Sequence, residues 1–427
     1  MRLRERILNL TLPFLVRDQK ALDMTVEWLL RNGYPRMASM ALTWGPTHSG
    51  ATVNEKTALL CSTVWACCRL ISGCMGVMPC HVYQGDEDDS EKAPKHPLYY
   101  VVHDAADTNL SAGAWRNTMQ GHCLVWGNAY SQIIRRSGSG EILGFRVMTP
   151  DRVRVQAENN GDITYLYSPN QQDERKFKPS EVFHLRGESW DGISGYSIAK
   201  LAAESIGIAV SAELFAAMFY GMGGRTPGVL EYPGKFADKN QYDAFREKYD
   251  EVYSGQHGWH KTMILEGGMK WTATGTKPSD MQFIETRQWM VSEICRWYGV
   301  PPHLVADLSR ATNNNIEHLG IEFVQFCLGF WRGRWQDEFN LKCLERGSGY
   351  FVRMDPSGLT RGDFQSRMLG FASALQNGVF SVNEVRAIEG FNPIPGGESH
   401  HIQLNMQTLP GGPPTAAQIS AAAGQGG

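Results

Sequence analysis

Residues 196–222 read YSIAKLAAESIGIAVSAELFAAMFYGM, and the character of the chain changes more sharply here than anywhere else. Small residues recur in this stretch every three or four positions, the spacing of one face of a helix. They are Ala202, Ser205, Ala209, Ala212 and Ala216. Glycines and a proline within residues 221–227 indicate where the helix ends. The pattern predicts one long helix whose small side chains let another helix approach closely.

The part of the chain before this helix is predicted to contain helices and an antiparallel sheet. Residues 142–148, ILGFRVM, and 152–157, RVRVQA, alternate in polarity as half-buried strands do. The alternation places Leu143, Phe145 and Val147 on one face. Asn160-Gly161 suits a tight turn with positive φ angles, so residues 163–167, ITYLY, are expected to return along the second strand. The fold class is therefore predicted to be α+β.

A compact insertion follows the long helix at residues 225–276. It is expected to hold a helix that begins near Asp238, where Asp238 and Gln241 form a capping pair. The strands TMILE and MKWTA are expected around Gly267-Gly268. A module of about 50 residues is near the lower limit for an independent core, so it should lean on a neighbour. A second helix over 279–298 then completes a helical hairpin around the insertion.

The polar stretch SRATNNNIE, residues 309–317, stands between that second helix and a third. The third helix is expected to run to about residue 345, with Ile316, Phe323, Phe326 and Phe330 at helical spacing. Three consecutive asparagines suit a flexible connector or a helix cap, and this reading stays open. The last residues, from Thr408, are rich in Gly, Pro and Ala and are expected to be disordered.

Composition narrows the function classes. The chain has 427 residues and a net charge of -3, so it has no global attraction for nucleic acid or an acidic membrane. Charged residues interrupt the apolar run of residues 198–222, so no membrane span is predicted. The nine cysteines fit no metal-ligand spacing and are expected to be buried, reduced thiols.

Motifs for catalysis are weak. Residues 195–199, GYSIA, nearly match the G-x-S-x-G nucleophile elbow, but Ser197 is equally placed to cap the following helix. No phosphate-binding loop of the G-x-x-x-x-G-K-[ST] type occurs. The histidine pairs His257/His260 and His400/His401 lack a third metal ligand at a recognisable spacing. We therefore predict no catalytic residue, no metal and no cofactor.

Five segments, in this order, resemble the portal proteins of tailed bacteriophages, of the type found in long-tailed phages. The resemblance covers the chain from about residue 55 to residue 400. One departure is GFRVMTP, where the family more often has leucine and proline. The five segments are STVWACCRLISGCMGVMP (62–79), GNAYSQIIRRSGSGEILGFRVMTPDRVRV (127–155), FHLRGESWDGISGYSIAKLAA (183–203), ICRWYGVPPHLV (294–305) and ALQNGVFSVNEVRAIEGFNPIPGG (374–397).

The resemblance implies a portal-type subunit: a wing of helices and antiparallel strands, a two-helix stem, a small α/β clip and a short helical crown. Such subunits assemble into a ring, usually a dodecamer. The implied divisions are the wing (55–194 and 317–358), stem helices (195–223 and 277–299), clip (224–276), tunnel loop (300–316) and crown (359–406). The residues themselves predict an N-terminal amphipathic arm (1–54) and a disordered tail (407–427).

The resemblance also implies roles for particular residues. Polar, mostly uncharged tunnel-loop residues would face DNA that must slide, since each fixed contact between a cation and a phosphate adds affinity. They are Ser309, Arg310, Thr312, Asn313, Asn314 and Asn315. The small residues of the first stem helix would form the subunit interface. The clip would dock the terminase, through Asp238, Lys239, Arg246, Lys248 and Asp250.

The function implied is a channel at one capsid vertex through which double-stranded DNA is packaged and ejected. Its partners would be identical subunits, the terminase large subunit, the major capsid protein and the head-tail connector, with no membrane. The protein would be assembled in the host cytoplasm, reside in the virion and need no enzymatic activity. Two alternatives remain: a serine hydrolase using Ser197, and an oligomeric scaffold without a DNA role.

Overall fold

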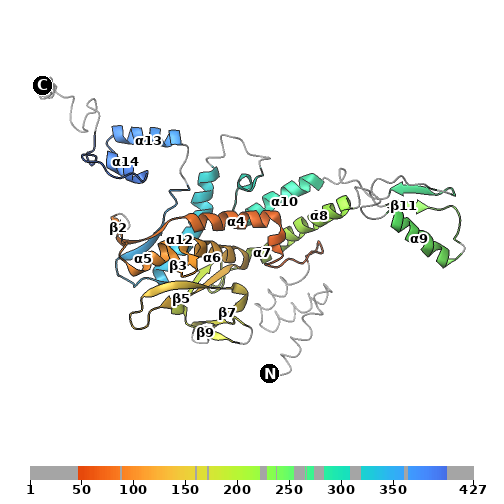
Figure 1. The fold of residues 1–427 in the computed structure, drawn as a ribbon, viewed down its shortest axis with the longest axis horizontal. Coiled ribbons are helices and arrows are strands. Elements are labelled where there is room, and N and C mark those ends of the chain that lie inside the picture. Colours follow the sequence, from red (N-terminus) through yellow and green to blue (C-terminus); the bar gives the residue numbers. More distant parts are fainter. Residues whose placement is uncertain are drawn as a thin grey trace, which may run out of the picture. The chain divides into compact units, whose positions relative to one another are not determined.

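A computed structural model describes residues 47–401, apart from ten short gaps, as two compact units, Met1–Pro356 and Ser357–Gly427 (Figure 1). The predicted N-terminal arm lies outside the described residues up to residue 46, and so does the predicted tail. The gaps are 87–88, 159–160, 171–172, 222–227, 237, 254–264, 266, 274–282, 308–318 and 360–363.

Small antiparallel sheets carry the first unit, and helices pack against them (Figure 1). One sheet orders β13 (Tyr350–Met354), β1 (Cys80–Gly85) and β2 (Ser90–Lys92). A second orders β10 (Val182–Arg186), β5 (Asn128–Arg135) and β6 (Ile142–Met148). A third orders β7 (Val153–Ala157), β8 (Ile163–Tyr167) and β9 (Arg175–Phe177). The two-stranded sheets are β3 (Ala105–Asp107) with β4 (Leu110–Ser111), and β11 (Gly228–Glu231) with β12 (Lys270–Ala273).

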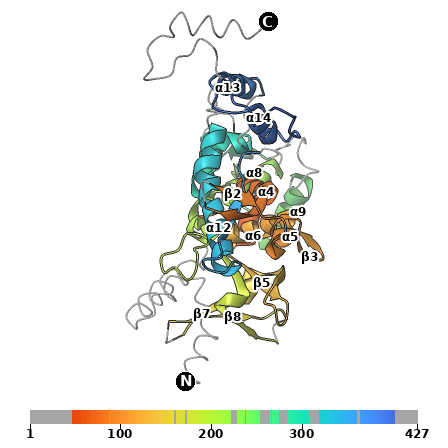
Figure 2. The same ribbon diagram turned by 90° about the vertical axis from the view of Figure 1, so that its left-hand side faces the viewer.

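The helices of the first unit come from distant parts of the chain. Helices α4 and α6 pack side by side, as both views show (Figures 1 and 2). Helix α12 covers strands β10 and β13. The α-helices are α4 (Ser62–Val77), α5 (Pro97–His103), α6 (Ala112–Trp126), α7 (Ile198–Leu201), α8 (Ala203–Gly221), α9 (Lys239–Tyr253), α10 (Phe283–Tyr298) and α12 (Gly329–Lys342).

Aromatic rings from four elements form the centre of this core. The Trp115 ring on α6 stacks on Phe145 of β6 with centroids 4.6 Å apart, and Phe183 of β10 lies 5.4 Å from Trp115. Trp335 and Phe339 on α12 close the cluster. Both indoles are satisfied, since Trp115 Nε1 donates to Ser131 Oγ and Trp335 Nε1 donates to Gln120 Oε1. Five buried aromatic rings, with the polar atoms of both indoles paired, give this part of the chain a well-packed core.

Arg116 on α6 holds the end of α4. It is buried, and its guanidinium donates to the carbonyl oxygens of Met75, Gly76 and Met78, and to that of Val102 on α5. The last carbonyls of a helix have no partner within the helix, so a buried helix end needs such donors. Burial lowers the pKa of Arg116 from its ordinary value. The four carbonyl dipoles take the place of water around this buried cation.

The strands predicted around residues 142–167 are confirmed as β6, β7 and β8, and β7 pairs with β8 beside Gly161, whose φ is +86°. The predicted shared face of Leu143 and Phe145 is wrong, because Phe145 is buried and Leu143 is exposed. A register shift explains this: Ile134 pairs with Gly144, and Arg135 pairs with Ile142. Leu143 is thus the extra residue of a β-bulge, which breaks the alternation.

The long third helix is described from residue 319 onward and passes through a π-helical segment, η7 (Phe323–Leu328), before it continues as α12. Phe323 is buried, but the predicted companion Phe326 is 70% exposed. A π-helix bonds residue i to i+5 and widens the turn, so an apolar face drawn with α-helical spacing loses its phase there.

The second unit contains α13 (Phe364–Gln376) and α14 (Val382–Ile388). Ser381 and Glu384 form a capping box at the start of α14. The turn GFNPIPGG closes on α14, because the Asn383 amide donates to the Ile394 carbonyl and accepts from the Ile394 N–H. Arg367 on α13 pairs with Glu389 at 2.6 Å and joins the two helices.

Candidate functional site

Helices α8 and α10 form a pair, called here the helix pair (Figure 1). They are the two helices predicted on either side of the insertion. Arg287 of α10 lies 3.9 Å from Glu213 of α8, and Met290 and Ile294 are buried on α10. Helix α10 also packs against α4. The pair is therefore tied at α10 to the part of the chain that carries the sheets.

The predicted single helix is divided at Ala202 into α7 and α8, and its small residues pack largely within the chain itself. Ala202, Ala209 and Ala216 are buried, whereas Ser205 and Ala212 are partly buried. At Gly207 a Cβ would lie 2.5 Å from Thr47 Oγ1, because residues 47–51 pack on this side of the helix. The predicted role of the small residues in a subunit interface stays a prediction, and a subunit neighbour would meet mainly other side chains.

Those other side chains are large and apolar. On α8 and α10 a set of aliphatic and aromatic residues is exposed, including Trp289 with 55% of its surface accessible. Soluble proteins rarely leave several such residues exposed on one element without a partner for them. The set comprises Ile208, Leu214, Phe215, Met218, Tyr220, Trp289 and Trp297.

Among the described helices, one, α8, is long and apolar enough to cross a membrane, over Ala203–Tyr220. Length and composition alone are weak evidence for a span, since a helix that packs in a soluble assembly passes the same test. Glu213, which pairs with Arg287 of α10, lies within this stretch. A charged pair and an exposed apolar face together fit a protein interface better than a lipid environment.

The helix pair carries more carboxylates than cations. Helix α8 contains no lysine or arginine. On α10, Arg287 pairs with Glu213 of α8 and Arg296 pairs with Glu293. Each arginine therefore has a carboxylate partner. A surface of this kind has little capacity to hold phosphates by counterion release.

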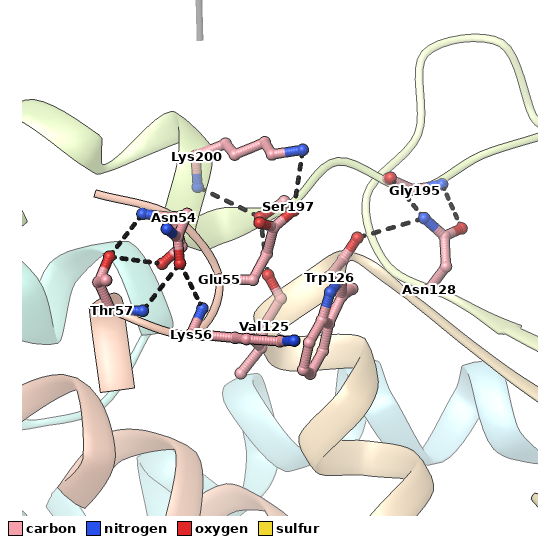
Figure 3. Close-up of polar contacts among 10 residues, drawn as sticks. All are labelled: Asn54, Glu55, Lys56, Thr57, Val125, Trp126, Asn128, Gly195, Ser197 and Lys200. Atoms are coloured by element: carbon pink, nitrogen blue, oxygen red, sulfur yellow. Dashed lines mark hydrogen bonds and ion pairs between the residues drawn. The ribbon is translucent and has the colours of Figure 1, made fainter. Parts of the chain in front are cut away.

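The start of the helix pair is fixed by side-chain hydrogen bonds (Figure 3). Ser197 is buried, its Oγ donates to the Val125 carbonyl at 2.7 Å, and it accepts from the Lys200 N–H at 3.2 Å. Lys200 Nζ also lies 2.8 Å from Glu55 Oε1. The hydroxyl of Ser197 is thus occupied as the N-cap of α7. A nucleophilic serine needs a general base at its hydroxyl, and a backbone carbonyl supplies none.

Three glycines let the chain cross itself just before α7. A Cβ at Gly127 would lie 2.2 Å from the Tyr196 carbonyl oxygen, and one at Gly195 would lie 2.1 Å from the Gly127 oxygen. Gly187 donates its N–H to the same Gly127 oxygen. No side chain fits between backbones this close. The crossing holds the segment before the helix pair against the end of α6 and the end of β10.

A buried amide and imidazole extend this anchor into the sheet (Figure 3 shows Asn128 and Gly195). Asn128 accepts from the Gly195 N–H at 2.7 Å and donates to the Gly195 carbonyl at 2.8 Å. Its oxygen also bonds His184 Nε2, which must be the donor, so Nδ1 accepts from the Tyr165 hydroxyl. Burial, with Arg186 and Lys342 nearby, lowers the pKa of His184 well below its ordinary value. His184 is therefore a neutral structural link.

The insertion is described in part. The predicted capping pair is confirmed, because the Gln241 N–H donates to Asp238 Oδ1 at 2.8 Å. Strand β12 contains most of the predicted MKWTA strand and pairs with β11, whereas TMILE lies almost wholly outside the described residues. Phe236 contacts Tyr232, Tyr242 and Phe245 and makes a small aromatic core. The predicted docking residues Lys239, Arg246 and Lys248 are exposed on α9, and the side chain of Asp250 lies outside the described part of the structure.

The predicted loop residues Ser309 to Asn315 all lie outside the described residues. The chain leading to them is described up to Asp307, through the short helix η6 (Pro302–Val305). A cavity of about 450 Å³ lies between η6 and α4, with Leu304 and Val305 on one wall and Arg69 and Cys74 on the other. In the part of the chain that the structure describes, no group of three His, Cys, Asp or Glu residues is placed to hold a metal.

Comparison with known proteins decides the family. The family model described as phage portal protein matches residues 62–390. The chain belongs to the phage portal protein family. The match spans both units, the helix pair and the insertion between them. It confirms the resemblance seen in the sequence.

Two relatives are phage portal proteins by name. The chain is 27% identical to the portal protein of Enterobacteria phage HK97, with 82% of each chain covered. It is 29% identical to the probable portal protein of Streptomyces phage phiC31, with 84% of this chain and 81% of that one covered. The predicted likeness to portal proteins of long-tailed phages is consistent with both.

Solved structures show the same fold. A HK97 family phage portal protein from Corynebacterium diphtheriae gives a TM-score of 0.54 at 17% identity, covering 71% of this chain and 94% of that one. A chain from the virion of a native gene transfer agent particle gives 0.55 at 20% identity, covering 82% and 95%. The predicted α+β fold of the portal type is thereby confirmed.

Sequence reasoning missed the glycine crossing and the exposed apolar residues. Gly127 and Gly195 stand beside predicted strand and helix ends, where a turn is the ordinary explanation, and only their contact in space shows their use. The exposed residues of the helix pair could have been found, since α8 is apolar on more than one face. The small-residue pattern drew attention to the opposite, buried side.

Proposed function

We propose that this protein is the subunit of a phage portal: a closed ring at one capsid vertex through which double-stranded DNA enters and leaves the head. The family match over residues 62–390 carries the proposal. In it, α8 and α10 are the stem, the insertion with β11, α9 and β12 is the clip, and the sheet-bearing part is the wing. The second unit, with α13 and α14, is the crown.

Ring formation is supported by the exposed apolar residues of the helix pair. A cyclic ring repeats one head-to-tail interface, so each subunit must offer two different surfaces. Ile208, Phe215 and Met218 on α8, and Trp289 on α10, are suitable contacts for the neighbouring subunit. A portal-like ring is also consistent with a gene transfer agent neck, whose structure was computed with C12 symmetry.

Free passage of DNA is supported by the paired charges of the stem. A bore lined by unpaired arginines would hold phosphates and slow translocation. Arg287 and Arg296 have carboxylate partners, and the segment 309–315 offers hydroxyl and amide groups with Arg310 as its one cation. We assign DNA contact in the tunnel to this segment, and terminase docking to the exposed face of α9. The major capsid protein and the head-tail connector are the further proposed partners.

Electron microscopy of the purified protein tests the assembly. We expect closed rings with an axial channel, each about twelve times the chain mass of 47.7 kDa. The channel assignment is tested by Arg310→Ala in a packaging reaction. Rings should form normally while the rate or retention of DNA packaging changes. Loss of rings in Arg310→Ala would show that this residue is structural, and monomers without rings at any concentration would count against the portal assignment.

The hydrolase alternative finds no support at Ser197, because its hydroxyl donates to a backbone carbonyl and caps α7. Labelling with a serine-reactive fluorophosphonate checks this directly. We expect no labelling of the native protein, and Ser197→Ala rings should be indistinguishable from wild-type rings. A scaffold without a DNA role would form the same rings but would not support packaging.

A further inference from the structure

Helices α4 and α10 meet at a pair of cysteines. Cys67 on α4 and Cys295 on α10 are both buried, and their sulfur atoms lie 3.9 Å apart. They are 228 residues apart in the sequence. All nine cysteines of the chain are free thiols in this structure, and six of them are buried.

We propose that Cys67 and Cys295 are a site of intramolecular disulfide formation that ties α4 to α10 when the protein meets a small oxidant such as hydrogen peroxide. Sulfur atoms 3.9 Å apart must approach to about 2.05 Å, a movement within the reach of side-chain rotation and small helix shifts. The proposal rests on this juxtaposition and does not depend on the proposed function.

The two thiols are not equivalent. Hydrogen bonding from Cys67 lowers the pKa of Cys295, and the same contact, together with burial, raises the pKa of Cys67. Cys295 is therefore the thiol that more readily becomes the thiolate, which is the reactive form. Cys74 and Cys327 are partly exposed, and Cys74 lines the cavity of about 450 Å³ beside α4. The cavity is large enough for a small uncharged oxidant, and Cys74 lies about two turns along α4 from Cys67.

The chemistry balances with one molecule of peroxide. The Cys295 thiolate attacks one peroxide oxygen, the O–O bond breaks, and hydroxide leaves and takes up the proton that Cys295 released. The sulfenic acid on Cys295 is then attacked by the Cys67 sulfur, the S–O bond breaks, and the departing hydroxide takes the Cys67 proton. Two thiols lose two electrons in all, and one peroxide is reduced to two waters.

Peptide mapping tests the pairing. Wild-type protein is treated with rising peroxide until Cys74, a partly exposed reference thiol, is half oxidised, and is then denatured and alkylated. Trypsin releases Cys295 in peptide 288–296 and Cys67 in peptide 57–69, which also contains Cys61 and Cys68. We expect the two peptides linked by a disulfide, with fragment ions between Cys67 and Cys68 placing the link at Cys67. Closing so long a loop should also speed migration on a non-reducing gel.

Single substitutions of the three cysteines in peptide 57–69 identify the one that forms the disulfide with Cys295. Cys68→Ala and Cys61→Ala should keep the cross-link, whereas Cys67→Ala and Cys295→Ala should lose it together with the gel shift. The proposal is overturned if Cys67 and Cys295 are both fully alkylated when Cys74 is half oxidised, or if the link to peptide 288–296 survives in Cys67→Ala. The wild-type fragment ions decide the question even if a variant fails to fold.

Discussion

The sheet-bearing core and the helix pair differ in the exposure of their large apolar side chains. In the core, Trp115, Phe183 and Trp335 are fully buried, and both indoles donate hydrogen bonds within the chain. In the helix pair, Leu214, Phe215 and Trp289 are exposed. The described residues of one region cover their own aromatic rings, and those of the other leave apolar surface exposed. We propose that a neighbouring subunit covers this surface.

The largest expected effect is at the crossing that joins the two regions. Gly127→Ala places a Cβ 2.2 Å from the Tyr196 oxygen, in a backbone with φ of +76°. We expect the free energy of unfolding to fall by more than about 4 kcal/mol, measured by urea denaturation. Gly140→Ala is the control, because its φ is +70° and nothing lies within 4 Å of its Cβ, so it should lose only about 1–2 kcal/mol. Equal losses would show that the crossing can relax.

The comparison itself is tested by one substitution in each region. Phe183→Ala removes a ring that is 0% exposed and should cost about 3–5 kcal/mol of unfolding free energy. Phe215→Ala removes a ring that is 41% exposed and should cost clearly less, about 1 kcal/mol. We expect Phe215→Ala instead to raise the concentration needed for ring assembly roughly tenfold, seen by light scattering. If Phe215→Ala assembles into rings at the wild-type concentration, the subunit interface does not include Phe215.

A third substitution tests whether the small residues of α8 pack within the chain or against a neighbouring subunit. Ala209→Leu should overpack a buried position and cost about 1–3 kcal/mol in urea denaturation. Ala217→Leu, at an exposed position of the same helix, should leave the free energy of unfolding nearly unchanged. If Ala209→Leu unfolds like wild type but no longer forms rings, the small residues are part of the subunit interface after all.

The smallest effect is a pH dependence that belongs to the core alone. The pKa of His184 in the folded chain is below that of an unfolded histidine, about 6.5, so the unfolded chain takes up this proton first as pH falls. The contribution of His184 is present above pH 6.5 and is lost below it, by about 1.4 kcal/mol per pH unit until the folded pKa is reached. Urea denaturation of wild type and His184→Gln at pH 7 and pH 5.5 isolates it. Parallel pH dependences would contradict the assignment.

Local elements could be predicted from the sequence, and their contacts could not. The hairpin of β7 and β8 and the helix cap at Asp238 can be predicted from local signals. These are alternating polarity, an Asn-Gly turn and a capping pair, each contained within a few residues. The predicted faces of Leu143 and Phe326 are wrong because a β-bulge and a π-helix shift the side-chain periodicity without a sequence signal of their own. The glycine crossing and the pair of Cys67 and Cys295 join segments far apart in the chain, which periodicity does not detect.

The hydrogen bonds donated by Arg116 bear on the order in which the helices fold. Its four carbonyl partners lie on α4, on α5 and just beyond α4, between 14 and 41 residues from Arg116 in the sequence. A buried cation is costly until every partner is in place, so these helices should order together rather than one by one. All of them precede residue 127, whereas β13 begins at Tyr350. On the ribosome, this helical cluster can assemble long before the strand that completes the first sheet has been synthesised.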